Sequence, residues 1–247
     1  MSISKRQNEI LRIIGENEYV SVNELSRMLF TSPSSIRRDL AHLQNLGFVK
    51  RSHGGVSQPE VTGNVAGFYS RVMKNIKEKR VISQKAASLL KDGQSILLDS
   101  STTSSFMIPY IARLESPTVF TNNLETAISS IKQGIRTHCI GGTSVNGSAA
   151  LGGALTYKAL SDIHVDVLFF SSQALDRSGV ISDATEVENY VRSLMLACAD
   201  TTVFLCDSYK FDARSTYTLT TLDNVDFAVF DREYEELATK TGKCKII

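Results

Sequence analysis

The amino-acid sequence predicts two domains of different class: a small, mostly helical domain that ends in a hairpin, and a larger α/β domain with a mostly parallel sheet. In the first 46 residues, apolar side chains recur at the three- and four-residue spacing of amphipathic helices. From residue 95 onward, short apolar runs alternate with helical segments, which is typical of a parallel sheet covered on both faces. Charge is also unevenly distributed, since residues 1–57 carry eight lysines and arginines against five acidic residues, while the whole chain has a net charge of +1. We therefore expect the first domain to bind a polyanion.

The small domain begins with two helices that the sequence predicts separately. Apolar spacing indicates a first helix over residues 4–17. A second helix opens at Ser21, because serine followed three residues later by Glu24 forms a capping box that satisfies free backbone N–H groups. A third helix follows closely, which is the plan of a helix–turn–helix.

The third helix, over residues 31–46, has the strongest functional signal. Ser32 caps its first turn, and Pro33 suits that turn because its missing N–H would be unpaired anyway. Its apolar stripe leaves Arg37 and Arg38 at exposed positions among small polar residues. Small side chains allow approach to a major groove, and arginines reach phosphates or guanine edges. A solvated amphipathic helix is the alternative interpretation.

A basic hairpin is predicted directly behind this helix. Gly54 and Gly55 supply the positive φ angles of a tight turn between two short extended runs. Helices followed by such a hairpin form a winged helix–turn–helix, whose wing meets the DNA backbone or minor groove; some modules of this plan bind proteins instead. The residues predicted to contact DNA are Ser34, Ser35, Arg37, Arg38, His42, Lys50, Arg51 and His53.

The domain limits follow from composition. We predict the DNA-binding domain over residues 1–57, a linker with Pro, Gly and Asn over 58–73, and the α/β domain over 74–247. In the α/β domain, helices are expected over 74–90, 104–114, 124–132 and 185–199, and strands over 95–99, 118–121, 137–140, 165–170, 202–206 and 225–230.

Polar residues and glycines follow several of the predicted strands. Because ligands of such sheets bind outside the carboxyl ends of the strands, these residues are candidates for a small-molecule site. Four consecutive hydroxyls after Asp99, next to a helix start, suit a phosphate group, although any one of them could be an ordinary helix cap. The residues predicted from this pattern to bind an effector are Asp99, Ser100, Ser101, Thr102, Thr103, Thr121, Asn122, Gly141, Gly142, Asp207 and Lys210.

Other classes of protein find little support. The four cysteines are widely spaced without a CxxC pair, so we expect reduced thiols and neither a metal site nor a disulfide framework. Nucleotide-binding and hydrolase motifs are absent from the sequence, and we expect no cofactor and no catalytic residues. With no long apolar run and no leader-like N-terminus, we expect a cytoplasmic protein that does not bind membranes.

The sequence resembles the DeoR family of bacterial transcription regulators. In the small domain the resemblance lies in Ser35-Ile36-Arg37-Arg38-Asp39-Leu40 and His53-Gly54-Gly55, and in the large domain in Asp99–Thr103, Thr121-Asn122, Gly141-Gly142, Glu186 and Asp207-x-x-Lys210. It implies a C-terminal domain like ribose-5-phosphate isomerase that senses a phosphorylated sugar, and it adds Glu186 to the effector residues. It also implies a repressor of a sugar-metabolism operon that binds double-stranded operator DNA.

Two further expectations accompany this resemblance. A homodimer or homotetramer is expected, because one winged helix makes too few contacts for tight specific binding. The rival interpretation is a sugar-phosphate isomerase with an appended DNA-binding domain, in which Asp162, Asp166 or Asp176 would act as acid or base.

Overall fold

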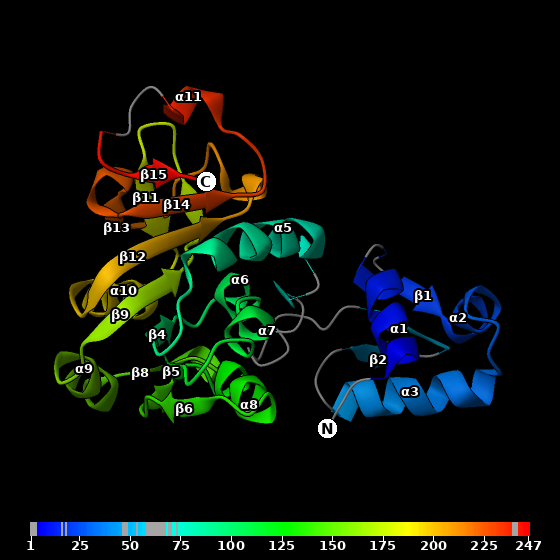
Figure 1. Ribbon diagram of the computed structural model, residues 1–247. Coiled ribbons are helices and arrows are strands. Elements are labelled where there is room, and N and C mark those ends of the chain that lie inside the picture. Colours follow the sequence, from blue (N-terminus) through cyan, green and yellow to red (C-terminus); the bar gives the residue numbers. More distant parts are fainter. Residues whose placement is uncertain are drawn as a thin grey trace. The chain divides into compact units, whose positions relative to one another are not determined.

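The computed structural model describes residues 4–15, 17, 19–45, 49–52, 54–57, 68, 71–72, 74–238 and 242–247 (Figure 1). The chain divides into two compact units, and along the sequence the smaller gives way to the larger after Lys74. The predicted linker over residues 58–73 lies almost entirely outside the described residues. Among the described residues, no helix has the length and apolar character needed to cross a membrane.

In its described residues, the smaller unit has three helices and a three-stranded antiparallel sheet in the order β1-β3-β2. Its elements are α1 (Lys5–Gly15), β1 (Tyr19–Ser21), α2 (Val22–Met28), α3 (Pro33–Asn45), β2 (Lys50–Ser52) and β3 (Gly55–Ser57). The predicted capping box is present, since the Ser21 side chain accepts from the Glu24 N–H and the Glu24 side chain accepts from the Ser21 N–H. One apolar core joins the three helices to the sheet, with Ile10, Leu25, Ile36, Leu40, Leu43 and Val56 fully buried.

The larger unit is built on a seven-stranded sheet in the order β15-β14-β12-β9-β4-β5-β6, with every neighbouring pair parallel (Figure 1). Its strands are β4 (Ser95–Leu98), β5 (Thr118–Thr121), β6 (Arg136–Cys139), β9 (Val165–Phe170), β12 (Ala199–Cys206), β14 (Phe227–Phe230) and β15 (Lys245–Ile246). Its α-helices are α5 (Ile76–Ala86), α6 (Thr102–Ser105), α7 (Ile108–Ile111), α8 (Leu124–Lys132), α9 (Ala154–Ser161), α10 (Glu186–Ala197) and α11 (Glu235–Ala238). Short 3₁₀ turns are η1 (Ala87–Leu89), η2 (Val145–Gly147), η3 (Ser208–Lys210) and η4 (Leu222–Asn224).

Two apolar cores lie on opposite faces of this sheet, because successive strand residues point to opposite sides. In β9, Val167 and Phe169 pack with α5 and α7 on one face, whereas Leu168 and Phe170 pack with α9 and α10 on the other. The mostly parallel α/β sheet that the sequence predicts is therefore observed, with both faces covered.

Some elements differ from the sequence prediction. The helix expected over 104–114 is divided into α6 and α7, because Pro109 has no N–H and its ring clashes with the preceding turn. The sequence also did not predict α9 or two small antiparallel sheets: β10 (Ala174–Leu175) with β11 (Val180–Asp183) and β13 (Tyr217–Thr221), and β7 (Thr143–Ser144) with β8 (Leu151–Gly152). These strands are short and mix polar with apolar residues, so the local pattern does not distinguish them from loops before their partners are known.

Candidate functional site

The helix α3 of the smaller unit begins and packs as its sequence predicts. Ser32 Oγ accepts a hydrogen bond from the Ser35 N–H at 3.3 Å, and Pro33 is the first helical residue. The stripe of Ile36, Leu40 and Leu43 is fully buried, so the opposite side of the helix faces solvent.

That opposite side carries most of the predicted DNA contacts. Ser34, Arg37 and Arg38 are exposed, while Ser35 and His42 are half-buried. The Arg38 guanidinium donates to Ser35 Oγ at 3.3 Å, which keeps the arginine along the first turns of α3. The helix therefore presents two cations and two hydroxyls on one accessible surface.

The sequence pattern predicts no role for Asp39, which lies on the flank of α3. Its carboxylate accepts from Arg6 Nε at 2.6 Å and from Gln7 Nε2 at 3.0 Å, and the Asp39 hydrogen bond raises the pKa of Arg6. Asp39 is buried and thereby fixes α1 against α3. Residues three apart share a helix face, so the position of Asp39 three residues after Ile36 indicates that its side chain points inward.

The predicted hairpin is also present. β2 pairs antiparallel with β3, and Lys50 and Arg51 are exposed on β2. Gly54 has a φ of 78°, which favours glycine, and a Cβ at Gly55 would lie 2.3 Å from the Tyr19 hydroxyl. The glycines are therefore required by the turn and by packing on β1, and His53 lies outside the described residues.

In the larger unit, the strand order reverses at one place in the sheet. The chain runs from β4 outward through β5 to β6, and then returns to place β9 on the other side of β4. Open parallel sheets bind ligands where the strand order reverses in this way, outside the carboxyl ends of the strands. The residues that follow β4 and β9 therefore define the candidate site.

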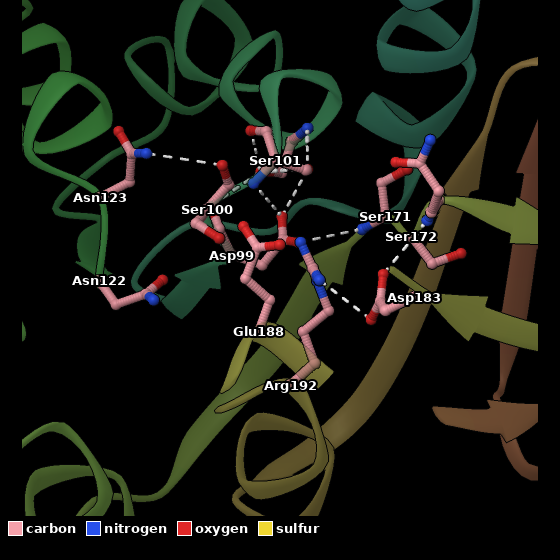
Figure 2. Close-up of polar contacts among 12 residues, drawn as sticks. Asp99, Ser100, Ser101, Asn122, Asn123, Ser171, Ser172, Asp183, Glu188 and Arg192 are labelled. Carbon is pink, nitrogen blue, oxygen red and sulfur yellow. Dashed lines mark hydrogen bonds and ion pairs between the residues drawn. The ribbon is translucent and has the colours of Figure 1, made fainter. Parts of the chain in front are cut away.

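Asp99 follows β4 and lies at the centre of this site (Figure 2). One carboxylate oxygen accepts from the N–H and the hydroxyl of Ser101, at 3.1 and 2.5 Å. The other accepts from the Ser171 N–H at 3.3 Å and from Arg192 Nε at 2.8 Å. Because Asp99 is fully buried and bonded on both oxygens, it holds the loop in place and does not face solvent.

Arg192 of α10 is the main residue that sequence reasoning missed. Its guanidinium lies between two buried carboxylates, at 2.8 Å from Asp99 and 3.0 Å from Asp183, as Figure 2 shows. Burial alone would lower the pKa of Arg192, but the two carboxylates raise it above its ordinary value. Burial raises the pKa of Asp183, and attraction to Arg192 offsets part of that rise. Helical spacing indicates that Arg192 points inward, because it shares a face of α10 with the buried Met195.

The four predicted hydroxyls after Asp99 have different environments. Ser101 is a helix cap, because its Oγ accepts from the Ser104 N–H at 3.1 Å. Ser100, Thr102 and Thr103 are buried in the loop and the first turn of α6. The ordinary capping interpretation therefore holds for Ser101.

The end of β5 brings a second polar group to the site. Asn122 is buried; its Nδ2 donates to the Leu151 carbonyl at 2.8 Å, and its Oδ1 has no hydrogen-bond partner among the described residues. Thr121 Oγ1 accepts from the Asn123 N–H at 3.2 Å, and Asn123 Nδ2 donates to the Ser100 carbonyl at 3.5 Å. Asn123 thus joins the β5 end to the β4 loop, and Asn122 keeps a buried acceptor unused.

The two glycines that follow β6 differ in what they require. A Cβ at Gly142 would lie 2.1 Å from Thr156 Oγ1 and 2.6 Å from the Gly152 carbonyl oxygen, and its φ is 151°. A Cβ at Gly141 would meet nothing within 4 Å. Packing therefore demands glycine at position 142, whereas Gly141 borders open space.

Lys210 links the ends of β9 and β12. Its Nζ donates to Ser171 Oγ at 2.8 Å and lies 3.7 Å from Asp207 Oδ2. Ser171 is consequently held from both sides, since its N–H bonds Asp99. The other Asp207 oxygen accepts from Asn75 Nδ2 at 3.0 Å. The structure therefore brings the predicted Asp99, Asp207 and Lys210 into one connected cluster.

Glu186 lies apart from this cluster in the orientation observed. It is exposed on the first turn of α10, whereas Glu188 is half-buried and accepts from Thr185 Oγ1 at 2.9 Å. Glu188 is the acidic residue of that turn that reaches toward the β4 loop and Arg192 (Figure 2).

Both units of the chain match known protein families. The family described as the DeoR C-terminal sensor domain matches residues 74–232, and the DeoR-like helix-turn-helix domain matches residues 6–62. The chain belongs to the DeoR family. It is therefore a DNA-binding transcriptional regulator, as the resemblance implied.

Relatives of this DeoR-family regulator match it over nearly their whole length. The HTH-type transcriptional regulator GolR of Listeria innocua is 31% identical over 96% of this chain and 93% of its own. An L-fucose operon activator of Haemophilus influenzae is 30% identical, covering 92% of this chain and 91% of its own. A glycerol-3-phosphate regulon repressor of the same organism is 26% identical, covering 92% and 89%.

A solved ribose-5-phosphate isomerase from Methanocaldococcus jannaschii is a far more distant match. It has a TM-score of 0.42 and 16% identity, over 56% of this chain and 55% of the isomerase. The relatives that match this DeoR-family protein over nearly its whole length are regulators.

The aspartates suggested for an isomerase reaction have structural contacts instead. Asp166, near the amino end of β9, accepts from the N–H and hydroxyl of Ser95 at 2.7 and 2.6 Å, and these bonds lower its pKa. Asp162 pairs with Lys158 on the surface of α9. Asp176 accepts from the Ser178 and Val180 N–H groups in the turn before β11. None of these contacts joins the cluster at Asp99.

Proposed function

We propose that this DeoR-family regulator is a repressor of a sugar-metabolism operon, and that a phosphorylated sugar bound at the carboxyl ends of the parallel strands weakens its hold on the operator. The observation that carries the effector half of the proposal is the cluster at the point where the strand order reverses. There, a lysine and an unused buried amide oxygen accompany a loop of hydroxyls.

On the DNA side, α3 enters the major groove and the β2–β3 wing contacts the backbone. Arg37 and Arg38 reach base edges or phosphates from the exposed side of α3, and Ser34 and Ser35 allow close approach. His42 lies one turn further along α3, and the wing supplies Lys50 and Arg51, with His53 as a further predicted contact. Each phosphate contact adds to the salt dependence of binding.

On the effector side, Lys210 supplies the positive charge for a phosphate group. The carboxylates of Asp99 and Asp183 would repel a phosphate group, but the Arg192 guanidinium between them offsets their negative charge. Asn122 Oδ1 is a buried acceptor suited to a sugar hydroxyl, and Gly141 leaves room for a ligand. Ser100, Thr102, Thr103, Thr121, Gly142, Glu186 and Asp207 complete the proposed set. Relatives named for a glycerol-3-phosphate regulon and an L-fucose operon support a carbohydrate metabolite as the ligand.

The contacts of Lys210 also suggest how binding is communicated. A phosphate that attracts Lys210 competes with Ser171 Oγ and with Asp207 for the ammonium group. Asp207 is in turn bonded to Asn75, the residue before α5 and the first of the larger unit. Effector control requires that the ligand bind the DNA-competent and DNA-incompetent arrangements with different affinity. We propose that the two arrangements differ in the contacts that Asp207 makes with Lys210 and with Asn75.

The test uses the full-length protein, an operator fragment and a panel of sugar phosphates. Effector candidates are first found as compounds that raise the melting temperature, since a ligand specific to the native state stabilises it. Arg38→Ala should weaken operator binding at least tenfold in fluorescence anisotropy, with an unchanged melting temperature. Lys210→Met should leave operator binding intact but remove release by the effector.

Two results would contradict the proposal. Full effector release by Lys210→Met would place the phosphate elsewhere, and unchanged operator binding by Arg38→Ala would remove α3 as the reading helix. Tighter operator binding in the presence of the effector would replace the repressor interpretation with an activator, as in the relative named an L-fucose operon activator.

A further inference from the structure

Helix α8 carries a row of exposed apolar side chains along one side. Leu124, Ile128 and Ile131 are 44%, 46% and 60% exposed, and their spacing of four and then three residues aligns them on the helix surface. The buried residues of α8, including Ala127 and Ser130, lie on a different side. Single exposed apolar residues are normal on a protein surface, but a continuous row of large aliphatic side chains indicates an interaction surface.

This row lies at the free margin of the sheet. β6 is the last strand in the sheet order, and among the described residues its pairing partner is β5 alone. At about 100° per residue, the apolar row lies roughly a third of a turn from the buried side of α8. The connection from β5 through α8 to β6 is expected to be right-handed, as in other β–α–β units. With that handedness, the row lies on the side of α8 that points away from β5 and beyond the edge strand β6. The apolar row and the unpaired strand edge therefore belong to one surface.

The charges beside the row make this surface complementary to itself. Glu125 lies in the first turn of α8 and Lys132 in the last. When two copies of α8 pack antiparallel about an axis near Ile128, each Glu125 lies opposite the Lys132 of the other copy. The helix dipoles then also run in opposite directions, which favours this packing.

The dimensions of α8 and β6 allow one axis to relate both pairs. A nine-residue helix and a four-residue strand are each about 13 Å long, so a single two-fold axis can pass near both centres. An antiparallel arrangement about such an axis uses the same surface on both copies, as closed dimers do.

We infer that α8 and β6 form the interface of a homodimer, with α8 packed antiparallel on the α8 of a second copy and the two β6 edges side by side. The dimer gives the regulator two copies of α3 for paired half-sites of an operator. This interface requires neither effector nor operator, so its test is independent of the proposed function.

The first experiment is sedimentation velocity on the full-length protein. Ile128→Glu places like charges against each other at the axis, and we expect the dimer dissociation constant to rise at least tenfold. Ser129→Glu is the matched control, because Ser129 is exposed on the same helix but lies away from the apolar row. It should leave the dissociation constant unchanged, and circular dichroism melts establish that both variants fold.

A second experiment locates the axis itself. In a Cys139→Ser background, which removes the exposed native thiol, Ile128→Cys should form a disulfide-linked dimer on mild oxidation, while Ser129→Cys should not. The inference is overturned if the wild-type chain sediments as a monomer at tens of micromolar. It is equally overturned if the dimer persists in Ile128→Glu and Ile128→Cys fails to cross-link.

Discussion

Replacing Arg192 with methionine should destabilise the larger unit substantially. The change removes the guanidinium between two buried carboxylates, while Asp99 keeps its bonds from Ser101 and Ser171 and Asp183 keeps one from the Gln173 N–H. Removing one partner of a buried ion pair typically costs about 3–5 kcal/mol. Because Asp99 retains several donors, we expect a loss of about 3 kcal/mol at pH 7.5 for Arg192→Met.

The loss should depend on pH in a defined direction. Burial already raises the pKa of Asp183 in the folded protein, and without Arg192 this pKa should rise further. A carboxyl group with a raised folded-state pKa stabilises the folded protein below that pKa and loses this contribution as pH rises through it. The difference between Arg192→Met and wild type should therefore be smaller at pH 5 than at pH 7.5.

The measurement is urea unfolding followed by far-ultraviolet circular dichroism, since the chain has no tryptophan. The transition of the larger unit is the one to compare, because two units can unfold separately. Arg192→Lys is the control; it keeps the charge but not the forked geometry, and should cost about 1–2 kcal/mol. A loss below about 1 kcal/mol for Arg192→Met at both pH values would refute the structural role assigned to this ion pair.

Two further predictions separate packing from binding. Gly142→Ala should lower stability by about 1–3 kcal/mol in thermal denaturation, because the new Cβ meets a hydroxyl and a carbonyl oxygen. Gly141→Ala should change stability by less than about 0.5 kcal/mol, because its Cβ would meet nothing. Equal effects of the two substitutions would contradict the packing explanation. Asp39→Ala should cost about 1–2 kcal/mol by leaving a buried amide without its acceptor, and operator affinity should fall with it. Arg38→Ala should lower affinity alone, and a full-affinity Asp39→Ala protein would show that α1 need not be fixed to α3 for binding.

The parts of the fold that follow local patterns could be predicted from the sequence. The strands expected over 118–121 and 165–170 coincide with β5 and β9, because each is rich in β-branched and aromatic residues and is bounded by turn residues. The capping box at Ser21 was equally visible, since its two partners lie three residues apart. In both cases the determining contacts are short-range in sequence.

The remainder depends on long-range pairing that no local pattern contains. The position of β9 beside β4 decides where the strand order reverses, yet the strands are about seventy residues apart. Arg192 is 93 residues from Asp99, so the sequence could indicate that it points inward but not what it meets. For the same reason, the sequence predicts a ligand site in the loop after β4 but does not reveal that Asp99 already accepts hydrogen bonds from Ser171 and Arg192.

These contacts divide the predicted effector residues into two kinds. A carboxylate that accepts from Ser101, Ser171 and Arg192 has no capacity left for a ligand, so Asp99 acts by holding the β4 loop against β9 and α10. Lys210 differs, because its ammonium group has three donors and its bond to Ser171 can be exchanged for one to a phosphate. The loop that the sequence marks most strongly therefore supplies the rigidity of the site. In the proposed mechanism, the response to the effector comes from the end of β12, where Lys210 bonds Ser171 at the end of β9.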